Sequence, residues 1–244
     1  MERLLLRPVR TAASIIMCVI LATACKSAGK GPDPIPADAF SASAIVTLDV
    51  AHSVGKTGNA NQSGTLMLIS GGGTSTATFA GDPTLVTHGH TLAGQMLRIG
   101  DGVGSRFSMS GSFKSGTAST DGIFSDLSFD IRNLSENQSV RVTFRAIVSN
   151  AVSATGADAY AFSGLSVRDA ENTEVYFSAH RIDTKNPVNE LAAIAPSDVF
   201  SIVLLPGAST KLNALQHQRG GVNSPGNYAA TLDASIRIEG IDLI

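Results

Sequence analysis

The chain has 244 residues, with 18 lysines and arginines against 20 aspartates and glutamates, which gives a formal net charge of −2 at pH 7. No basic stripe of the kind that neutralises nucleic-acid phosphates is visible, so nucleic-acid binding is not expected. Tryptophan is absent and there are only 3 tyrosines, so rings that stack on sugars or bases are scarce, although phenylalanine could substitute.

The first residues have the pattern of an export signal. Arg3, Arg7 and Arg10 precede an uncharged run over residues 11–24, TAASIIMCVILATA. A helix that spans a membrane needs about 20 apolar residues, and this run is shorter. Small residues end the run, and Cys25 follows directly. We therefore expect residues 1–24 to be a cleaved signal peptide.

This junction resembles bacterial lipoprotein signals, in which a leucine-type residue and small residues precede a cysteine. Here Leu21 leads into Ala-Thr-Ala and Cys25, with the leucine one place further from the cysteine than in the commonest pattern. The resemblance implies that Cys25 is the acylated first residue of a membrane-anchored protein of the bacterial cell envelope. It also implies outer-membrane sorting if the envelope is Gram-negative, because Lys26 is not aspartate. The alternative is an ordinary cleaved signal in which Cys25 is incidental.

Residues 25–40 predict a linker between this anchor and a folded domain. They contain two glycines and three prolines without apolar periodicity. Cys18 lies inside the predicted signal, so Cys25 would be the one cysteine left after cleavage. A disulfide and a cysteine-based metal site are then excluded, and the domain expected over residues 41–244 depends on its hydrophobic core.

From residue 41 onward, about ten segments alternate apolar and polar residues or form short apolar runs between turns, as β-strands do. The clearest alternation covers residues 139–148, followed by the last predicted strand at 228–238. In residues 174–182 we expect Val175, Phe177 and Ala179 to face inward. The other predicted strands are 44–50, 64–70, 75–80, 95–100, 106–113, 126–131 and 198–207.

Half-apolar strands without intervening helices predict antiparallel sheets, each with one face in solvent. The fold class is therefore all-β, a two-sheet sandwich of immunoglobulin-like or jelly-roll type, with a helical turn or two within residues 185–198. Parts of the second half, such as residues 129–144, loosely resemble the β-sandwiches of secreted bacterial proteins. The glycines of GDGVG, residues 100–104, lack the third glycine and the helix of a dinucleotide site, so we expect a hairpin turn at 101–104.

His88 and His90 are the weak candidates for chemistry. Residues two apart on a strand face the same side, so both imidazoles could reach one metal ion. Zinc sites need three or four ligands, and nothing in the sequence places another histidine nearby, so two solvent-facing histidines remain the simpler interpretation. No catalytic residue and no cofactor is predicted, and no binding residue is assigned.

Three functions remain open from the sequence. The first is a non-enzymatic, lipid-anchored envelope sandwich with a structural or binding role, in which long loops would carry recognition of a ligand or protein partner. The second is an envelope hydrolase or metal-dependent enzyme that uses His88 and His90. The third is a surface assembly subunit whose open sheet edge accepts a strand from a partner. The candidate recognition loops are residues 52–63, 81–95, 183–198 and 217–227.

Overall fold

The computed structural model describes residues 40–51, 59–70, 73–81, 87–93, 98–113 and 116–244. These residues form thirteen strands and one 3₁₀ turn, η1 (Pro187–Asn189), and all of them fall in one compact unit. Within these ranges, no helix has the length and apolar character needed to cross a membrane. The predicted boundaries after residues 24 and 40 stay predictions, because the segments that they separate from the domain lie outside the described residues.

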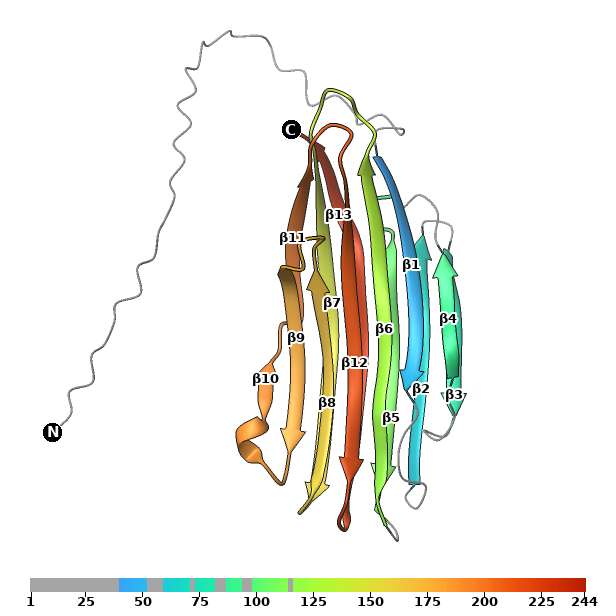
Figure 1. The fold of residues 1–244 in the computed structure, drawn as a ribbon, viewed down its shortest axis with the longest axis vertical. Helices are drawn as coiled ribbons and strands as arrows, with labels where there is room; N and C mark the ends of the chain where they lie inside the picture. The colour runs from blue at the N-terminus through green and yellow to red at the C-terminus, as the bar shows by residue number, and fades with distance from the viewer. Residues whose placement is uncertain (1–39, 52–58, 71–72, 82–86, 94–97, 114–115) are drawn as a thin grey trace, which may run out of the picture. The chain divides into compact units, whose positions relative to one another are not determined.

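The strands form two antiparallel sheets that lie face to face, which confirms the predicted β-sandwich (Figure 1). Sheet A has the order β10 (Leu191–Ala193), β9 (Glu174–Asp183), β8 (Ala159–Arg168), β12 (Ser209–Val222), β6 (Ala118–Asn133), β1 (Phe40–Ala51) and β4 (Thr87–Ala93). Sheet B has the order β11 (Ser197–Leu204), β7 (Val140–Gly156), β13 (Gly226–Leu243), β5 (Gly102–Ser112), β2 (Asn59–Ser70) and β3 (Gly73–Gly81).

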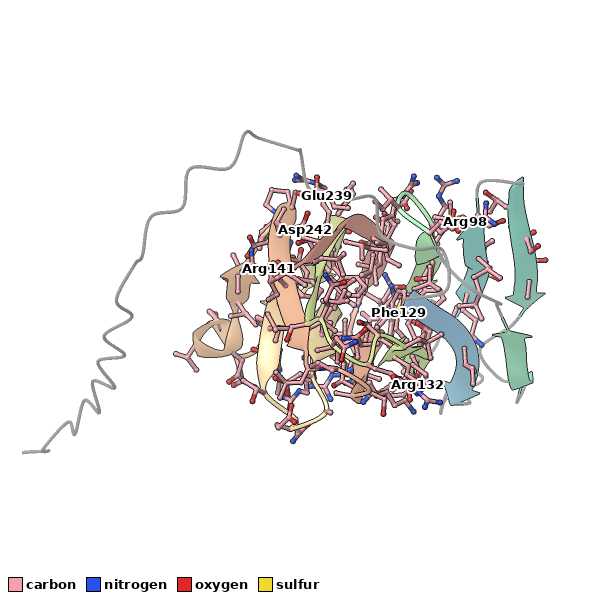
Figure 2. The ribbon with its side chains drawn as sticks, turned by 90° about the horizontal axis from the view of Figure 1, so that it is seen from above. Arg98, Phe129, Arg132, Arg141, Glu239 and Asp242 are labelled. Carbon is pink, nitrogen blue, oxygen red and sulfur yellow. The ribbon has the colours of Figure 1, made fainter. Side chains whose placement is uncertain are left out.

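Apolar side chains at every second position fill the space between the sheets, as the alternation in the sequence predicts. Phe129 of β6 and Phe144 of β7 meet across the sandwich edge to face, with ring centroids 5.7 Å apart. Phe200 of β11 stacks on Phe144 at 5.5 Å. Viewed along the strands, Phe129 lies in the interior, whereas Arg98 and Arg132 lie at the periphery (Figure 2). These rings join the two sheets at the centre of the core.

Tyr228 of β13 fills space that two glycines leave open. A Cβ added to Gly111 would lie 2.3 Å from the Tyr228 ring, and one added to Gly220 would lie 2.4 Å from it. Gly111 belongs to the neighbouring strand of sheet B, whereas Gly220 belongs to sheet A. The Tyr228 hydroxyl lies 2.9 Å from the Thr120 hydroxyl of β6. The ring is therefore held between the sheets, with a hydrogen bond at its polar end.

The core also contains polar side chains that bridge the two sheets. Oε1 of Gln216 in β12 accepts hydrogen bonds from Ser125 of β6, at 2.7 Å, and from Ser105 of the facing β5. Asn150 of β7 donates across the sandwich to the Ser163 carbonyl of β8, at 2.7 Å. Because buried polar groups are costly unless paired, these bonds favour one alignment of the sheets over others.

The end of one predicted strand and one predicted turn are wrong, while residues 95–97 of that strand lie outside the described residues. Residues 98–100 are a turn instead of the end of a strand: the Asp101 amide donates to the Arg98 carbonyl at 2.9 Å, and Gly100 has φ +91°. The predicted turn at 101–104 belongs mainly to β5, which begins at Gly102. A Cβ on Gly102 would lie 2.1 Å from the Ile236 carbonyl oxygen. These glycines therefore allow close packing against β13, which a turn prediction does not anticipate.

Four described strands do not appear among the ten segments predicted from the sequence: β4, β8, β10 and β12. As a result, strands occupy parts of two predicted recognition loops. β4 covers Thr87–Ala93 within 81–95, and β12 and β13 leave only 223–225 between them from 217–227. Gly164 in β8 and the Gly220-Gly221 pair in β12 look like turn residues in sequence. In the fold these glycines lie within β8 and β12, which pair with each other in continuous register. Aromatic rings lie over the space that the missing side chains leave. The helical turn expected within 185–198 is present as η1.

Of the three residues of β9 that were expected to face inward, Val175 packs against the core as predicted, whereas Phe177 and Ala179 lie on the outer face. Tyr176 belongs to the core cluster, whereas Phe177 remains 38% exposed. Ala179 is fully buried but lies on the outer face of sheet A, beside Gly164. Two half-apolar faces alternate along this strand, and tertiary packing decides which of them turns inward.

Candidate functional site

The structure describes only some of the residues that the sequence predicts for lipid attachment or for chemistry. Cys25 lies outside the described residues. His88 and His90 belong to β4, the edge strand of sheet A, where His90 pairs with Leu48. Their side chains also lie outside the described part. Where side chains are described, no group of three or more histidine, cysteine, aspartate or glutamate residues is placed to hold a metal ion. The enzyme hypothesis therefore stays a prediction.

His180 and His217 lie on opposite faces of sheet A. His217 of β12 pairs with Gly164 of β8, which in turn pairs with Ala179 of β9. Ala179 thus shares the outer face with His217, and its neighbour His180 faces the other way. These two imidazoles cannot act together in one site.

An aromatic cluster occupies the outer face of sheet A around His217. The His217 ring stacks on Phe124 of β6 with centroids 4.3 Å apart and an interplanar angle of 17°. Phe162 of β8 packs against the other side at 5.2 Å. Both phenylalanine rings lie over glycines of their own strands, Gly122 and Gly164, because those positions carry no side chain. We call Phe124, Phe162 and His217 the aromatic row.

Burial within the aromatic row, together with the positive charge of Arg219, lowers the pKa of His217 to about 4. The Nε2 atom of His217 is buried and has no hydrogen-bond partner. Charging this imidazole would place a cation between two phenylalanine rings, without an acceptor for Nε2. His217 is therefore neutral at pH 7 and acts as part of an apolar surface.

A polar hollow of about 280 Å³ adjoins the aromatic row. It lies at the end of sheet A where β8 begins and β9 and β12 end. Its lining holds three cations and two carboxylates together with Tyr160, Asn186 and Asn223; the charged residues are Asp158, Arg181, Asp183, Lys185 and Arg219. We call it the basic hollow.

Two of the three cations in the basic hollow are neutralised by carboxylates. Arg181 Nη2 donates to Asp183 Oδ2 at 2.9 Å, and Lys185 Nζ donates to Asp158 Oδ2 at 2.9 Å. Burial raises the pKa of Asp183, but hydrogen bonds from the Asn186 amide, Arg181 and the Lys185 amide outweigh it and lower the pKa overall. The bond to Asp158 raises the pKa of Lys185. Each pair therefore holds a cation in direct contact with a carboxylate.

Arg219 is the cation of the hollow that no carboxylate neutralises within the described residues. Its guanidinium carbon lies 5.8 Å from the centroid of the Phe162 ring. Phe162 pairs with Arg219 on one side and with Arg181 on the other, so the two arginines flank one ring. Arg181 Nε is buried and has no hydrogen-bond partner. A buried guanidinium nitrogen without an acceptor costs free energy unless a ligand or a water molecule accepts its hydrogen bond.

This arrangement can bind an oxyanion beside an apolar surface. A guanidinium presents planar, paired donors that match a carboxylate, phosphate or sulfate group. The neighbouring Phe162 ring offers a surface for the rest of the ligand. Arg181 and Arg219 lie far apart in the chain, so no local pattern brings them together. Arg219 falls within the predicted loop 217–227, but in the fold it belongs to β12.

Comparisons with known proteins assign the chain to no family. No protein-family model matches it, and no curated protein matches it. Among solved structures, it is similar to a structure of the infectious bursal disease virus Gx strain, at 10% identity and TM-score 0.21, over 82% of this chain and 58% of that one. A VP2 subviral particle of the same virus matches at 10% identity and TM-score 0.22, over 81% and 57%. The chain thus spans less than two thirds of these proteins, and the sandwich assignment rests on its own strand pairing.

Proposed function

We propose that this protein is a lipid-anchored binding protein of the bacterial cell envelope, and that it binds an acidic glycan through the basic hollow and the aromatic row. The observation that supports binding most directly is Arg219, a cation without a carboxylate partner in the described structure, held over the Phe162 ring.

An acidic glycan fits this surface better than an anionic lipid layer does. An anionic lipid layer meets a protein as a broad charged plane, whereas this chain has a net charge of −2 and only one cation of the hollow without a carboxylate partner in the described structure. A polymer of uronic acid sugars instead brings single carboxylates to the guanidinium groups. Its sugar rings would pack against the phenylalanine rings, which lie in a row on the outer face of sheet A from β6 to β8.

The binding test uses the full chain in detergent micelles and polygalacturonate as the probe, with neutral dextran as the control polymer. Arg219→Gln should weaken polygalacturonate binding at least tenfold, and Arg219→Lys should restore only part of it, because lysine lacks the paired donors. Arg106→Gln on sheet B is the matched control, since Arg106 is also exposed and pairs with Asp233. Equal weakening in both glutamine variants, or none in Arg219→Gln, contradicts the proposal. So does a preference for anionic lipid vesicles.

The anchor is tested separately from binding. The small residues before Cys25 and the linker after it support acylation at this position. Acyl chains contribute about 0.8 kcal/mol per buried CH₂, so more than one chain gives durable attachment. Cys25→Ser should move the protein from the membrane pellet to the soluble fraction, and palmitate labelling should be lost. A variant that stays in the pellet refutes the anchor and leaves the binding proposal standing.

A further inference from the structure

β11 forms one edge of sheet B, and its outer side is open within the described structure. The strand pairs only with β7. The Pro196 carbonyl accepts from the Val148 amide on the β7 side, at 2.8 Å. Because peptide groups alternate in direction along a strand, those of Val199, Ser201 and Val203 point away from β7. In Figure 1, β11 continues above the start of β9.

This edge lacks most devices that protect sheet edges from pairing. Edges are usually short, kinked by a bulge, or marked by lysine or proline. β11 spans Ser197–Leu204 without lysine, arginine or proline, and its register with β7 is continuous. The one protective contact is at its start, where Asp198 Oδ1 accepts from the Val199 amide at 2.7 Å. By contrast, β10, the edge of sheet A on the same side, has only three residues.

Two exposed valines alternate with the exposed Ser197 and Ser201 along this edge, and Asp198 is exposed at its start. Val199 is 41% exposed and Val203 is 52% exposed, and both lie on the outer face of sheet B. Ile147 on β7 is 46% exposed and Leu205 is 65% exposed. Exposed valines beside unpaired peptide groups favour the addition of another strand.

The sequence of β11 is complementary to itself when two copies run antiparallel. With Ser201 opposite Ser201 of a second copy, Val199 lies opposite Val203 and Phe200 lies opposite Ile202. Pairs of β-branched residues, and of an aromatic with a β-branched residue, stabilise neighbouring strands. Asp198 lies opposite Leu204, so no like charges meet. The register also brings Leu205 of the second copy beside Ser197, next to Ile147 on β7.

We propose that two copies of this chain associate through β11, antiparallel and centred on Ser201, so that their B sheets join into one continuous sheet. Each residue of the contact then meets its counterpart around a two-fold axis, as in most homodimers. An eight-residue edge is small beside the roughly 1,600 Å² of a standard interface, so the dimer is weak at low concentration. Anchoring in one membrane, if the proposed lipidation holds, raises the local concentration and favours pairing.

Cysteine cross-linking of the full chain in membranes tests the register. Ser201→Cys should give a disulfide dimer on mild oxidation, because directly opposed residues have Cα separations that a disulfide can span. Val199→Cys and Val203→Cys should each cross-link poorly alone and well when the two variants are mixed. Thr76→Cys on β3, the opposite edge of sheet B, is the matched control, and the unmodified chain shows any contribution of Cys25. A dimer with Thr76→Cys as abundant as with Ser201→Cys overturns the proposal.

A second measurement distinguishes the loss of dimerisation from a loss of folding. Val199→Lys combined with Val203→Lys places lysines opposite each other across the axis, while both side chains remain on the exposed outer face. Light scattering of the detergent-solubilised chain should show the dimer dissociation constant raised at least tenfold, with an unchanged circular dichroism spectrum. Thr76→Lys should leave association unchanged. The inference is refuted if the wild-type chain stays monomeric at every concentration in detergent and Ser201→Cys forms no disulfide dimer in membranes.

Discussion

Protonation of His217 provides a direct test of the aromatic row. Its pKa is lowered from an ordinary 6.5 to about 4 by burial against Phe124 and Phe162. Between these two pH values the unfolded chain binds a proton that the folded chain does not, so stability falls as pH falls. A shift of this size corresponds to about 3 kcal/mol lost between pH 7 and pH 4, and no further loss from this group below its folded pKa.

His217→Phe removes the titration and keeps a ring between the two phenylalanines. Urea unfolding of wild type and variant should be compared at several pH values, because the other acid-titrating groups cancel in the difference. We expect the variant to gain about 3 kcal/mol relative to wild type between pH 7 and pH 4. It should also be the more stable protein at pH 7, since it lacks the unpaired Nε2. A difference that does not change with pH, or a proton NMR titration of His217 with a pKa of 6.5 or above, refutes the reasoning.

Two substitutions test the core. Phe129→Ala should destabilise the protein by about 3–5 kcal/mol, and lower Tm by roughly 6–20 °C, because it empties a fully buried site in contact with Phe144. Phe177→Ala on the exposed face should cost under about 1 kcal/mol, and similar losses from both would contradict the assigned faces. Gly220→Ala should cost about 1–3 kcal/mol in urea unfolding by crowding the Tyr228 ring, and the Tyr228→Leu background should relieve most of it.

Local patterns in the sequence determine the fold class and much of the core. Leu127, Phe129 and Ile131 alternate with polar residues, and all three are buried. The last strand behaves in the same way, from Tyr228 to Ile238. Alternation at period two is a property of a single strand, so it needs no knowledge of the partner. Strand ends were harder to predict: β7 runs to Gly156, well beyond the predicted end at residue 148.

The basic hollow and the open edge were decided by tertiary structure. Arg181 and Arg219 approach Phe162 only because β9 and β12 lie on either side of β8, an order that no local pattern specifies. Phe177 faces outward because the packing of Tyr176 fixes the other face of β9 inward. Likewise, β11 shows a typical buried pattern in sequence, and its place at the edge follows from the sheet order. Alternation specifies that a strand has two faces, whereas long-range pairing decides which neighbours those faces meet.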